Sequence, residues 1–252
     1  MERLKKEWFT GCKMEKNRLI YAALDYDSQK ENLAYAGNLV QGVDSDKYGF
    51  KINLDSVAHF SSSAANPYSH VKQVMSLGKP VFVDLKMWNG GRTMENVAKG
   101  CADLGVSIIN MYAHAGRKFV ERVKRSLEGS NTKLFTLTVL THYTDSDAQE
   151  IYGCSLSEAV QRLAKIGIEG GADGLILPGN QLEYFRSSPL EKLCPAIRPL
   201  WFEDTKANDQ EQTITPYEAV SGGADIIVVG SPIRRSKSPS EALIKIIEEI
   251  AS

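Results

Sequence analysis

Long apolar segments, an excess of one charge sign and paired cysteines are all missing from this chain of 252 residues. No window approaches the roughly 20 apolar residues that a membrane-spanning helix needs. The 30 basic and 31 acidic side chains nearly cancel, so the overall field favours neither nucleic acid nor an anionic membrane as the main partner. Any recognition of phosphate must therefore be local, at one pocket.

Cysteine patterns and cofactor motifs are equally sparse. None of the four cysteines, Cys12, Cys101, Cys154 and Cys194, forms a C-x-x-C pair or has the Cys/His spacing of a metal site. The sequence has no G-x-G-x-x-G, Walker loop, H-E-x-x-H or Ser-His-Asp set. Met1–Lys16 contains no apolar run of signal-peptide length. We therefore expect a cytoplasmic protein with reduced thiols.

Short apolar runs alternate with amphipathic stretches from about residue 18 to the end. Several runs are continuous in Val, Ile, Leu and Phe, which is typical of parallel strands buried on both faces. The expected strands are Leu19–Leu24, Tyr48–Asn53, Val81–Asp84, Ser107–Met111, Leu134–Leu140, Gly174–Leu177, Ile197–Phe202 and Asp225–Val229. The expected helices are Glu31–Val40, Thr93–Leu104, Arg117–Leu127, Ser157–Glu169 and Ser240–Ile250.

An internal repeat supports one architecture. Gly170-Gly171-Ala172-Asp173 and Gly222-Gly223-Ala224-Asp225 each run into an apolar strand, and glycine accepts the left-handed conformation that ends many helices. Repeated units of this kind suit a barrel of like βα modules. We predict an α/β fold, a single (β/α)8 TIM barrel over residues 1–252, with 1–17 as an N-terminal extension. A doubly wound open sheet with an insertion is the alternative.

Three charged residues lie in or directly after buried strands. Asp84 and Lys86 follow Val81-Phe82-Val83 and share one face by alternation, while Lys51 interrupts the apolar run Tyr48–Ile52. A lysine inside a strand needs a partner or water. Because active sites of β/α barrels lie at the carboxyl ends of the strands, we expect Asp84 between the two ammonium groups at the barrel mouth. The alternative is a buried ion network that only stabilises this end of the barrel.

A Lys–Asp–Lys row is suited to a reaction in which a carbanion develops beside an ammonium group. These residues resemble the orotidine 5′-phosphate decarboxylases, and the resemblance extends from about Leu19 to Ile250. The motifs that carry it occur in the order found in that family: Leu24-Asp25, Lys51-Ile52, Asp84-Leu85-Lys86, Thr138-Val139-Leu140-Thr141, and Asp209-Gln210 ahead of Thr215-Pro216.

The resemblance implies a cofactor-independent and metal-independent carboxy-lyase that converts orotidine monophosphate (OMP) to uridine monophosphate (UMP) in pyrimidine biosynthesis. It implies that Lys51, Asp84 and Lys86 are the catalytic charges. Asp25 would hold the ribose hydroxyls and Thr141 the pyrimidine. Gln210 would also contact the substrate, and the active unit would be a homodimer.

Two positions depart from the family pattern. The family has Asp-x-Lys-x-x-Asp, in which the last aspartate reaches the partner subunit's site, but this chain has Asn89 there. An amide can bond a ribose hydroxyl yet cannot repel a substrate carboxylate. The family's phosphate-binding Gly-Arg is here Gly230-Ser231, so we expect Arg234 or Arg235, together with the backbone amides of Gly230 and Ser231, to hold the phosphate. Alternatively, both arginines cap a helix or lie in solvent.

Because both departures touch function, two other hypotheses stay open. The first is a related sugar-phosphate lyase or synthase in which Asp84 coordinates magnesium. The second is a barrel that binds a nucleotide or phosphosugar without turnover. Among weaker signals, we expect His114 and His142 to be wall residues, Trp88 to pack at a subunit interface or in the core, and Thr93 to cap the helix that follows it.

Overall fold

Eight parallel strands close into a barrel in the computed structural model, which describes residues 18–57, 68–203 and 211–251. Each strand pairs with the next along the chain, and the last pairs with the first. The strands are β1 (Leu19–Leu24), β2 (Tyr48–Asn53), β3 (Val81–Met87), β4 (Ile108–Tyr112), β5 (Lys133–Leu137), β6 (Gly174–Ile176), β7 (Glu191–Cys194) and β8 (Ile226–Val229). The predicted (β/α)8 barrel is confirmed, and the open sheet is wrong.

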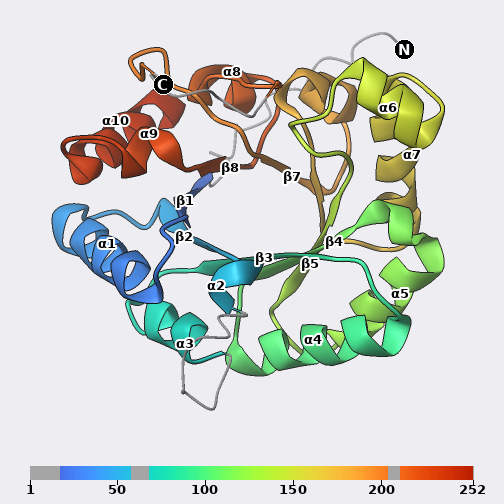
Figure 1. Ribbon diagram of the computed structural model, residues 1–252, viewed down its shortest axis with the longest axis horizontal. Coiled ribbons are helices and arrows are strands. Elements are labelled where there is room, and N and C mark those ends of the chain that lie inside the picture. The colour runs from blue at the N-terminus through green and yellow to red at the C-terminus, as the bar shows by residue number, and fades with distance from the viewer. Residues whose placement is uncertain (1–17, 58–67, 204–210, 252) are drawn as a thin grey trace, which may run out of the picture.

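Helices surround the strands on the outside of the barrel (Figure 1). They are α1 (Gln29–Gly42), α2 (Leu54–Val57), α3 (Ser69–Met75), α4 (Gly91–Leu104), α5 (Arg117–Ser126), α6 (Asp145–Tyr152), α7 (Leu156–Glu169), α8 (Pro216–Ser221), α9 (Ser231–Arg234) and α10 (Pro239–Ala251), with 3₁₀ turns η1 (Ala113–Ala115) and η2 (Gly179–Phe185). Within the described ranges, no helix has both the length and the apolar character to cross a membrane.

The seventh strand is the main correction to the sequence-based expectation. The predicted strand Ile197–Phe202 is wrong, because β7 is Glu191–Cys194 and Ile197 makes only an isolated bridge to Ile214. Pro199 removes a ladder donor from the expected segment, and Pro195 precedes it closely. The observed strand β7 contains charged residues. The buried Lys192 ammonium lies 3.0 Å from Asp225 Oδ2, so its charge has an opposite partner.

Smaller differences concern the ends of elements. β5 ends at Leu137, three residues before the expected end, and β3 continues past Asp84 to Met87. The expected Thr93 cap is wrong: α4 begins at Gly91 after Gly90, with no side-chain cap. The glycines at the helix ends behave as expected, since Gly171 and Gly223 adopt positive φ.

The inside of the barrel is filled by side chains that alternate along the strands. Tyr21, Ala23, Phe82, Ile108, Phe135, Leu137, Ile176, Leu193, Ile226 and Val228 form this inner cluster. A second cluster fills the layer between strands and helices. Alternation then assigns the next inward positions at the carboxyl ends to Asp84, two residues after Phe82, and Asn110, two residues after Ile108. The inner core thus forms the floor beneath a polar mouth.

Candidate active site

A cavity of about 290 Å³ opens at the carboxyl ends of the strands. Seven of the residues expected in the site from sequence line it: Asp25, Lys51, Asp84, Lys86, Thr141, Gly230 and Ser231. The described lining also contains Asn53, Asn110, His142 and Arg198, over an apolar base that includes Phe82, Leu137, Ile176 and Val228. One chamber therefore joins residues from all eight strands or the loops after them.

The three expected catalytic charges lie together, with Asp84 between the two ammonium groups as expected from the sequence. The Lys86 ammonium lies 2.6 Å from Asp84 Oδ2, and the Lys51 ammonium lies 3.9 Å from the same oxygen. Asp84 and Lys51 are about 90% buried at the side chain, whereas Lys86 is 37% exposed. Lys86 is therefore the member of the row most open to a bound ligand.

Asp25 extends the row by a fourth charge. The Lys51 ammonium donates to Asp25 Oδ1 at 3.0 Å and also to Asn53 Oδ1. The Asn53 amide in turn donates to Asp25 Oδ1 at 2.7 Å. Charges thus alternate in sign from Asp25 through Lys51 and Asp84 to Lys86, so each buried charge has an opposite neighbour.

The end of β3 is bent where it carries this charge. Lys86 adopts φ 45°, a left-handed conformation that is uncommon outside glycine, and the pairing of β3 with β4 shifts between Val83 and Met87. Asn110 holds the bend from β4. Its Oδ1 accepts from the Lys86 backbone N–H at 2.7 Å, and its Nδ2 donates to Asp84 Oδ1 at 2.8 Å. One side chain thereby orients both members of the Asp84–Lys86 pair.

These surroundings fix the charge state of Asp84. Burial alone would raise its pKa, but the positive charges of Lys51 and Lys86, with hydrogen bonds from Lys86 and Asn110, outweigh it and lower the pKa below the usual value for aspartate. Asp84 is therefore a carboxylate at neutral pH. Any anionic group brought next to it meets a fixed negative charge and two ammonium groups.

The phosphate end of the expected site differs from the sequence-based expectation. Neither Arg234 nor Arg235 belongs to the described lining of the mouth cavity. The Arg234 guanidinium lies over the ring of Tyr26, 5.2 Å from its centroid. Instead, Arg198 lines the cavity beside Gly230 and Ser231, with its Nη1 donating to the Ile197 carbonyl at 3.0 Å. Sequence reasoning missed Arg198 because it assigned this segment to a strand.

Asn89 lies outside the described lining of the mouth and is exposed. Its Oδ1 accepts from the Gly90 N–H at 2.7 Å.

Trp88, next to Asn89 in the chain, is 67% exposed, so the expectation that its indole packs in the core is wrong. The ring of Trp88 meets His114 edge to face at 4.5 Å, and His114 stacks on Tyr112 at 4.6 Å. Burial lowers the pKa of His114, which favours a neutral ring in this stack.

The loop after β5 is tied to a distant segment. The Thr141 carbonyl accepts from the backbone N–H groups of Glu211 and Gln212, both at 3.2 Å. Gln212 Nε2 also donates to the Tyr143 carbonyl at 2.8 Å. The expected substrate contact Gln210 lies outside the described residues, as does the whole segment 204–210.

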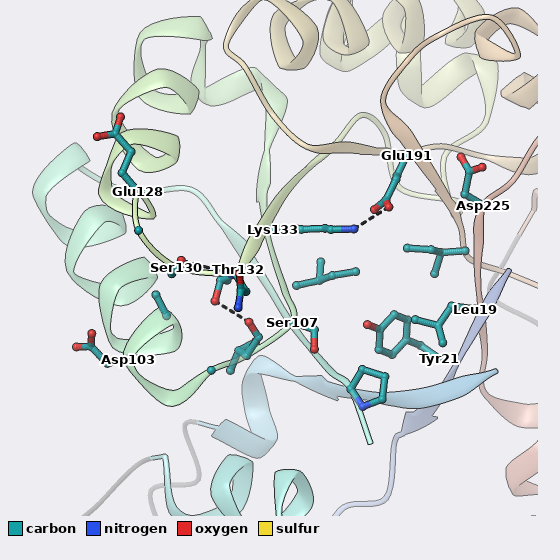
Figure 2. A pocket seen from close by; sticks show the side chains of 18 of the residues that line it. Leu19, Tyr21, Asp103, Ser107, Glu128, Ser130, Thr132, Lys133, Glu191 and Asp225 are labelled. Carbon is teal, nitrogen blue, oxygen red and sulfur yellow. Dashed lines mark hydrogen bonds and ion pairs between the residues drawn. The ribbon is translucent and has the colours of Figure 1, made fainter. Parts of the chain in front are cut away.

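A second cavity, of about 790 Å³, lies at the opposite end of the barrel, where the strands begin. Figure 2 shows Lys133 and Glu191 pointing toward each other there, and their charged groups lie 2.7 Å apart. Tyr21 and Ser107 also line this end. In β/α barrels this face generally serves stability, and the alternating charge row lies at the other end.

Known proteins are similar to this chain in sequence and in fold. The model of the orotidine 5′-phosphate decarboxylase / HUMPS family matches residues 18–246. Orotidine 5′-phosphate decarboxylase of Psychromonas ingrahamii is 32% identical over 239 residues, covering 92% of this chain and 96% of that protein. The protein of the same name from Actinobacillus succinogenes is 32% identical over 240 residues, covering 92% and 98%.

A solved structure agrees with these relatives. The crystal structure of orotidine 5′-phosphate decarboxylase from Lactobacillus acidophilus superposes with a TM-score of 0.76 at 25% identity, covering 93% of this chain and all of that one. The match of the family model extends over nearly all of the barrel, including every strand described above. The chain therefore belongs to the orotidine 5′-phosphate decarboxylase / HUMPS family.

Proposed function

We propose that this protein is a cofactor-independent decarboxylase that converts OMP to UMP, a step of pyrimidine biosynthesis, in the cytoplasm. The observation that carries the proposal is the buried Asp84 carboxylate held between Lys51 and Lys86 at the barrel mouth. Its lowered pKa keeps it ionised at neutral pH, so the site contains a preorganised charge pattern rather than one assembled on binding.

The chemistry follows from where the charges lie. The carboxylate of the substrate would lie beside Asp84, whose negative charge opposes it in the ground state. When the bond between C6 and the carboxylate carbon breaks, carbon dioxide leaves and the electron pair stays on C6. The Lys86 ammonium stabilises that pair and then donates its proton to C6. The negative charge next to Asp84 is thereby removed as the reaction proceeds.

Neighbouring groups would hold the rest of the nucleotide. Asp25 and Asn53 present oxygen and amide groups suited to the ribose hydroxyls. Arg198 and the backbone of Gly230 and Ser231, which also line the cavity, would take the phosphate. This assignment replaces Arg234 and Arg235, which we expected in that role from the sequence.

The two alternatives fit the described geometry less well. A magnesium ion at Asp84 would compete with the Lys86 ammonium on Oδ2 and with the Asn110 amide on Oδ1, and a divalent cation would lie beside two positive charges. A barrel that only binds its ligand would not require Lys86 to hold a strained backbone conformation beside the buried Asp84 carboxylate. An assay of OMP turnover with and without magnesium distinguishes both alternatives from the proposal.

The proposal is tested by incubating purified protein with OMP and following the ultraviolet change as UMP forms. We expect turnover without added metal and in the presence of a chelator. The variant Lys86→Met should lose about a thousandfold in kcat/KM, because it lacks both the charge and the proton, whereas Lys245→Met on α10 should not differ from wild type. Absence of turnover, or turnover that depends on magnesium, would rule the proposal out.

A further inference from the structure

The aromatic stack of Trp88, His114 and Tyr112 is a cluster of side chains that the mechanism leaves without a role. The His114 ring contacts both of the others, since its centroid lies 4.6 Å from that of Tyr112 and 4.5 Å from that of Trp88. Tyr112 ends β4, His114 belongs to η1 directly after it, and Trp88 directly follows β3. The stack therefore joins the carboxyl ends of two neighbouring strands.

The His114 ring is packed as an apolar surface. Among the residues that the structure describes, neither of its nitrogens has a hydrogen-bond partner, and both are buried. Burial also lowers the pKa of His114. An imidazole that serves as an acid, a base or a hydrogen-bond donor needs a nitrogen within reach of its partner. His114 thus contributes to the stack through the face and the edge of its ring.

The chain that enters the stack has just passed through a strained conformation. Lys86 is held at φ 45°, which a residue other than glycine retains only where its surroundings fix it. The Lys86 N–H donates to Asn110 Oδ1 at 2.7 Å, and Met87 pairs with Met111 in the sheet. Trp88 then enters the stack. Three consecutive residues, 86 to 88, are thus held in turn by β4 and η1.

The stack is the last of these three contacts before the next helix begins. Asn89 and Gly90, which follow Trp88, are exposed, and the Asn89 side chain bonds only the N–H of its neighbour Gly90 among the contacts described. If the stack were lost, the end of β3 would be held on one side only. The Lys86 backbone could then relax to an ordinary negative φ, which would turn its ammonium group away from Asp84.

We propose that the aromatic stack is a positioning device that keeps Lys86 in its left-handed conformation and so directs its ammonium group at the reacting carbon. None of the three rings belongs to the described lining of the mouth cavity, so they act through Lys86 and not on the substrate. The inference rests on the proposed function for the identity of the reaction. The hold on the Lys86 backbone does not depend on the substrate.

The first measurement is steady-state turnover of OMP by variants of the full-length protein that unfold at temperatures near that of wild type. His114→Leu keeps similar bulk but removes the ring, and its kcat should fall about tenfold while KM changes less than about twofold. His114→Phe restores a ring and should return kcat to within about twofold of wild type. Tyr184→Leu, which removes an exposed ring on η2, is the matched control and should have wild-type kinetics.

The second measurement does not require catalysis. Because the Lys86 N–H is bonded to Asn110, its hydrogen–deuterium exchange, followed by NMR, reports how firmly this backbone is held. We expect exchange at this amide to be about tenfold faster in His114→Leu and unchanged in His114→Phe. Tyr112→Leu removes the stacking partner of His114 and should behave like His114→Leu. It takes the place of that variant if His114→Leu does not fold.

The outcomes that overturn the inference are distinct. An unchanged kcat in His114→Leu would mean that the stack does not direct the ammonium group. Equal losses in His114→Leu and His114→Phe would mean that the imidazole itself is needed and not its ring surface. If wild-type protein does not turn over OMP, the proposed function fails on its own. Faster exchange in His114→Leu alone would then still support the hold on Lys86, and equal exchange in all variants would overturn it.

Discussion

At the scale of single residues, alternation along a strand predicted part of the site. Asp84 and Lys86 follow Phe82 at the spacing of two that points side chains inward, and the structure pairs them. The same rule applied to Ile108 and Lys51 leads to Asn110 and Asn53, which the sequence analysis overlooked because neither is charged. Arg198 could not be found this way, because it lies in irregular chain beyond the end of β7, after Pro195.

The lowered pKa of Asp84 predicts how stability depends on pH. A carboxyl whose pKa is lower in the folded than in the unfolded protein stabilises the fold above its unfolded pKa of about 4 and loses that contribution as the pH falls toward the folded value. Wild type should therefore lose more unfolding free energy than Asp84→Asn between about pH 5 and pH 3. Urea unfolding at a series of pH values measures this.

At pH 7, Asp84→Asn should unfold more easily than wild type by about 3 kcal/mol, because two ammonium groups lose their shared carboxylate. Asp147→Asn is not a suitable control, since that carboxylate caps α6. Asp103→Asn, at an exposed position in α4, is the better comparison. Equal acid sensitivity of wild type and Asp84→Asn would contradict the account of the charge row.

A second prediction at the scale of single residues concerns Asn89. Placing a carboxylate at this position with Asn89→Asp should raise kcat for OMP by about a hundredfold, because in the proposed homodimer the added charge would lie in the neighbouring site and repel the substrate carboxylate there. The isosteric change leaves the contact with the Gly90 N–H possible. Steady-state rates at one pH measure the effect. A rate equal to that of wild type would mean that position 89 does not reach a reacting group.

At the scale of elements, the pattern of apolar runs located seven of the eight strands. The exception, β7, begins with Glu191-Lys192, and local sequence favours a loop for two adjacent charges. Their partners come from other strands: Lys133 from β5 pairs with Glu191, and Asp225 before β8 pairs with Lys192. These ion pairs form only when the barrel closes, so a short stretch of the sequence does not predict them.

Glycines in two elements give opposite predictions for stability. A Cβ at Gly174 in β6 would lie 2.4 Å from ring atoms of the buried Phe135, so Gly174→Ala should destabilise the barrel by about 2 kcal/mol. A Cβ at Gly37 within α1 meets no atom within 4 Å, so Gly37→Ala should stabilise by about 0.5–1 kcal/mol. Thermal unfolding of the two variants measures both signs. A stabilised Gly174→Ala protein would contradict the packing inside the barrel.

At the scale of the whole molecule, closure of the barrel is what brings distant residues to one mouth. Asp25 follows the first strand and Ser231 follows the last, yet both line the cavity because β8 pairs with β1. The fold and its class followed from the sequence, since length, alternation and the repeated glycine pairs all favoured one architecture. The segments outside the described residues include Gln210, so that part of the site stays a prediction.

Trp88 leads to a prediction about assembly. We propose a homodimer in which the partner covers this exposed indole and Asn89 reaches the neighbouring site, as the family pattern implies. A large exposed aromatic beside a functional residue is typical of an interface. Light scattering should give twice the chain mass for wild type, and Trp88→Arg should shift the protein toward monomer. Tyr184→Arg, equally exposed but on η2, should remain a dimer. A wild-type monomer at all concentrations would contradict the proposal.

The central claim is that Lys86, held by Asp84 and Asn110, faces the carbon that loses its carboxylate. The most direct test is a crystal structure with a barbiturate nucleotide, whose oxygen at C6 takes the place of the developing negative charge. The account predicts this oxygen within about 3 Å of the Lys86 ammonium, the ribose hydroxyls at Asp25, and the phosphate at Arg198. A nucleotide bound with C6 turned away from Lys86, or bound outside the mouth of the barrel, would contradict it.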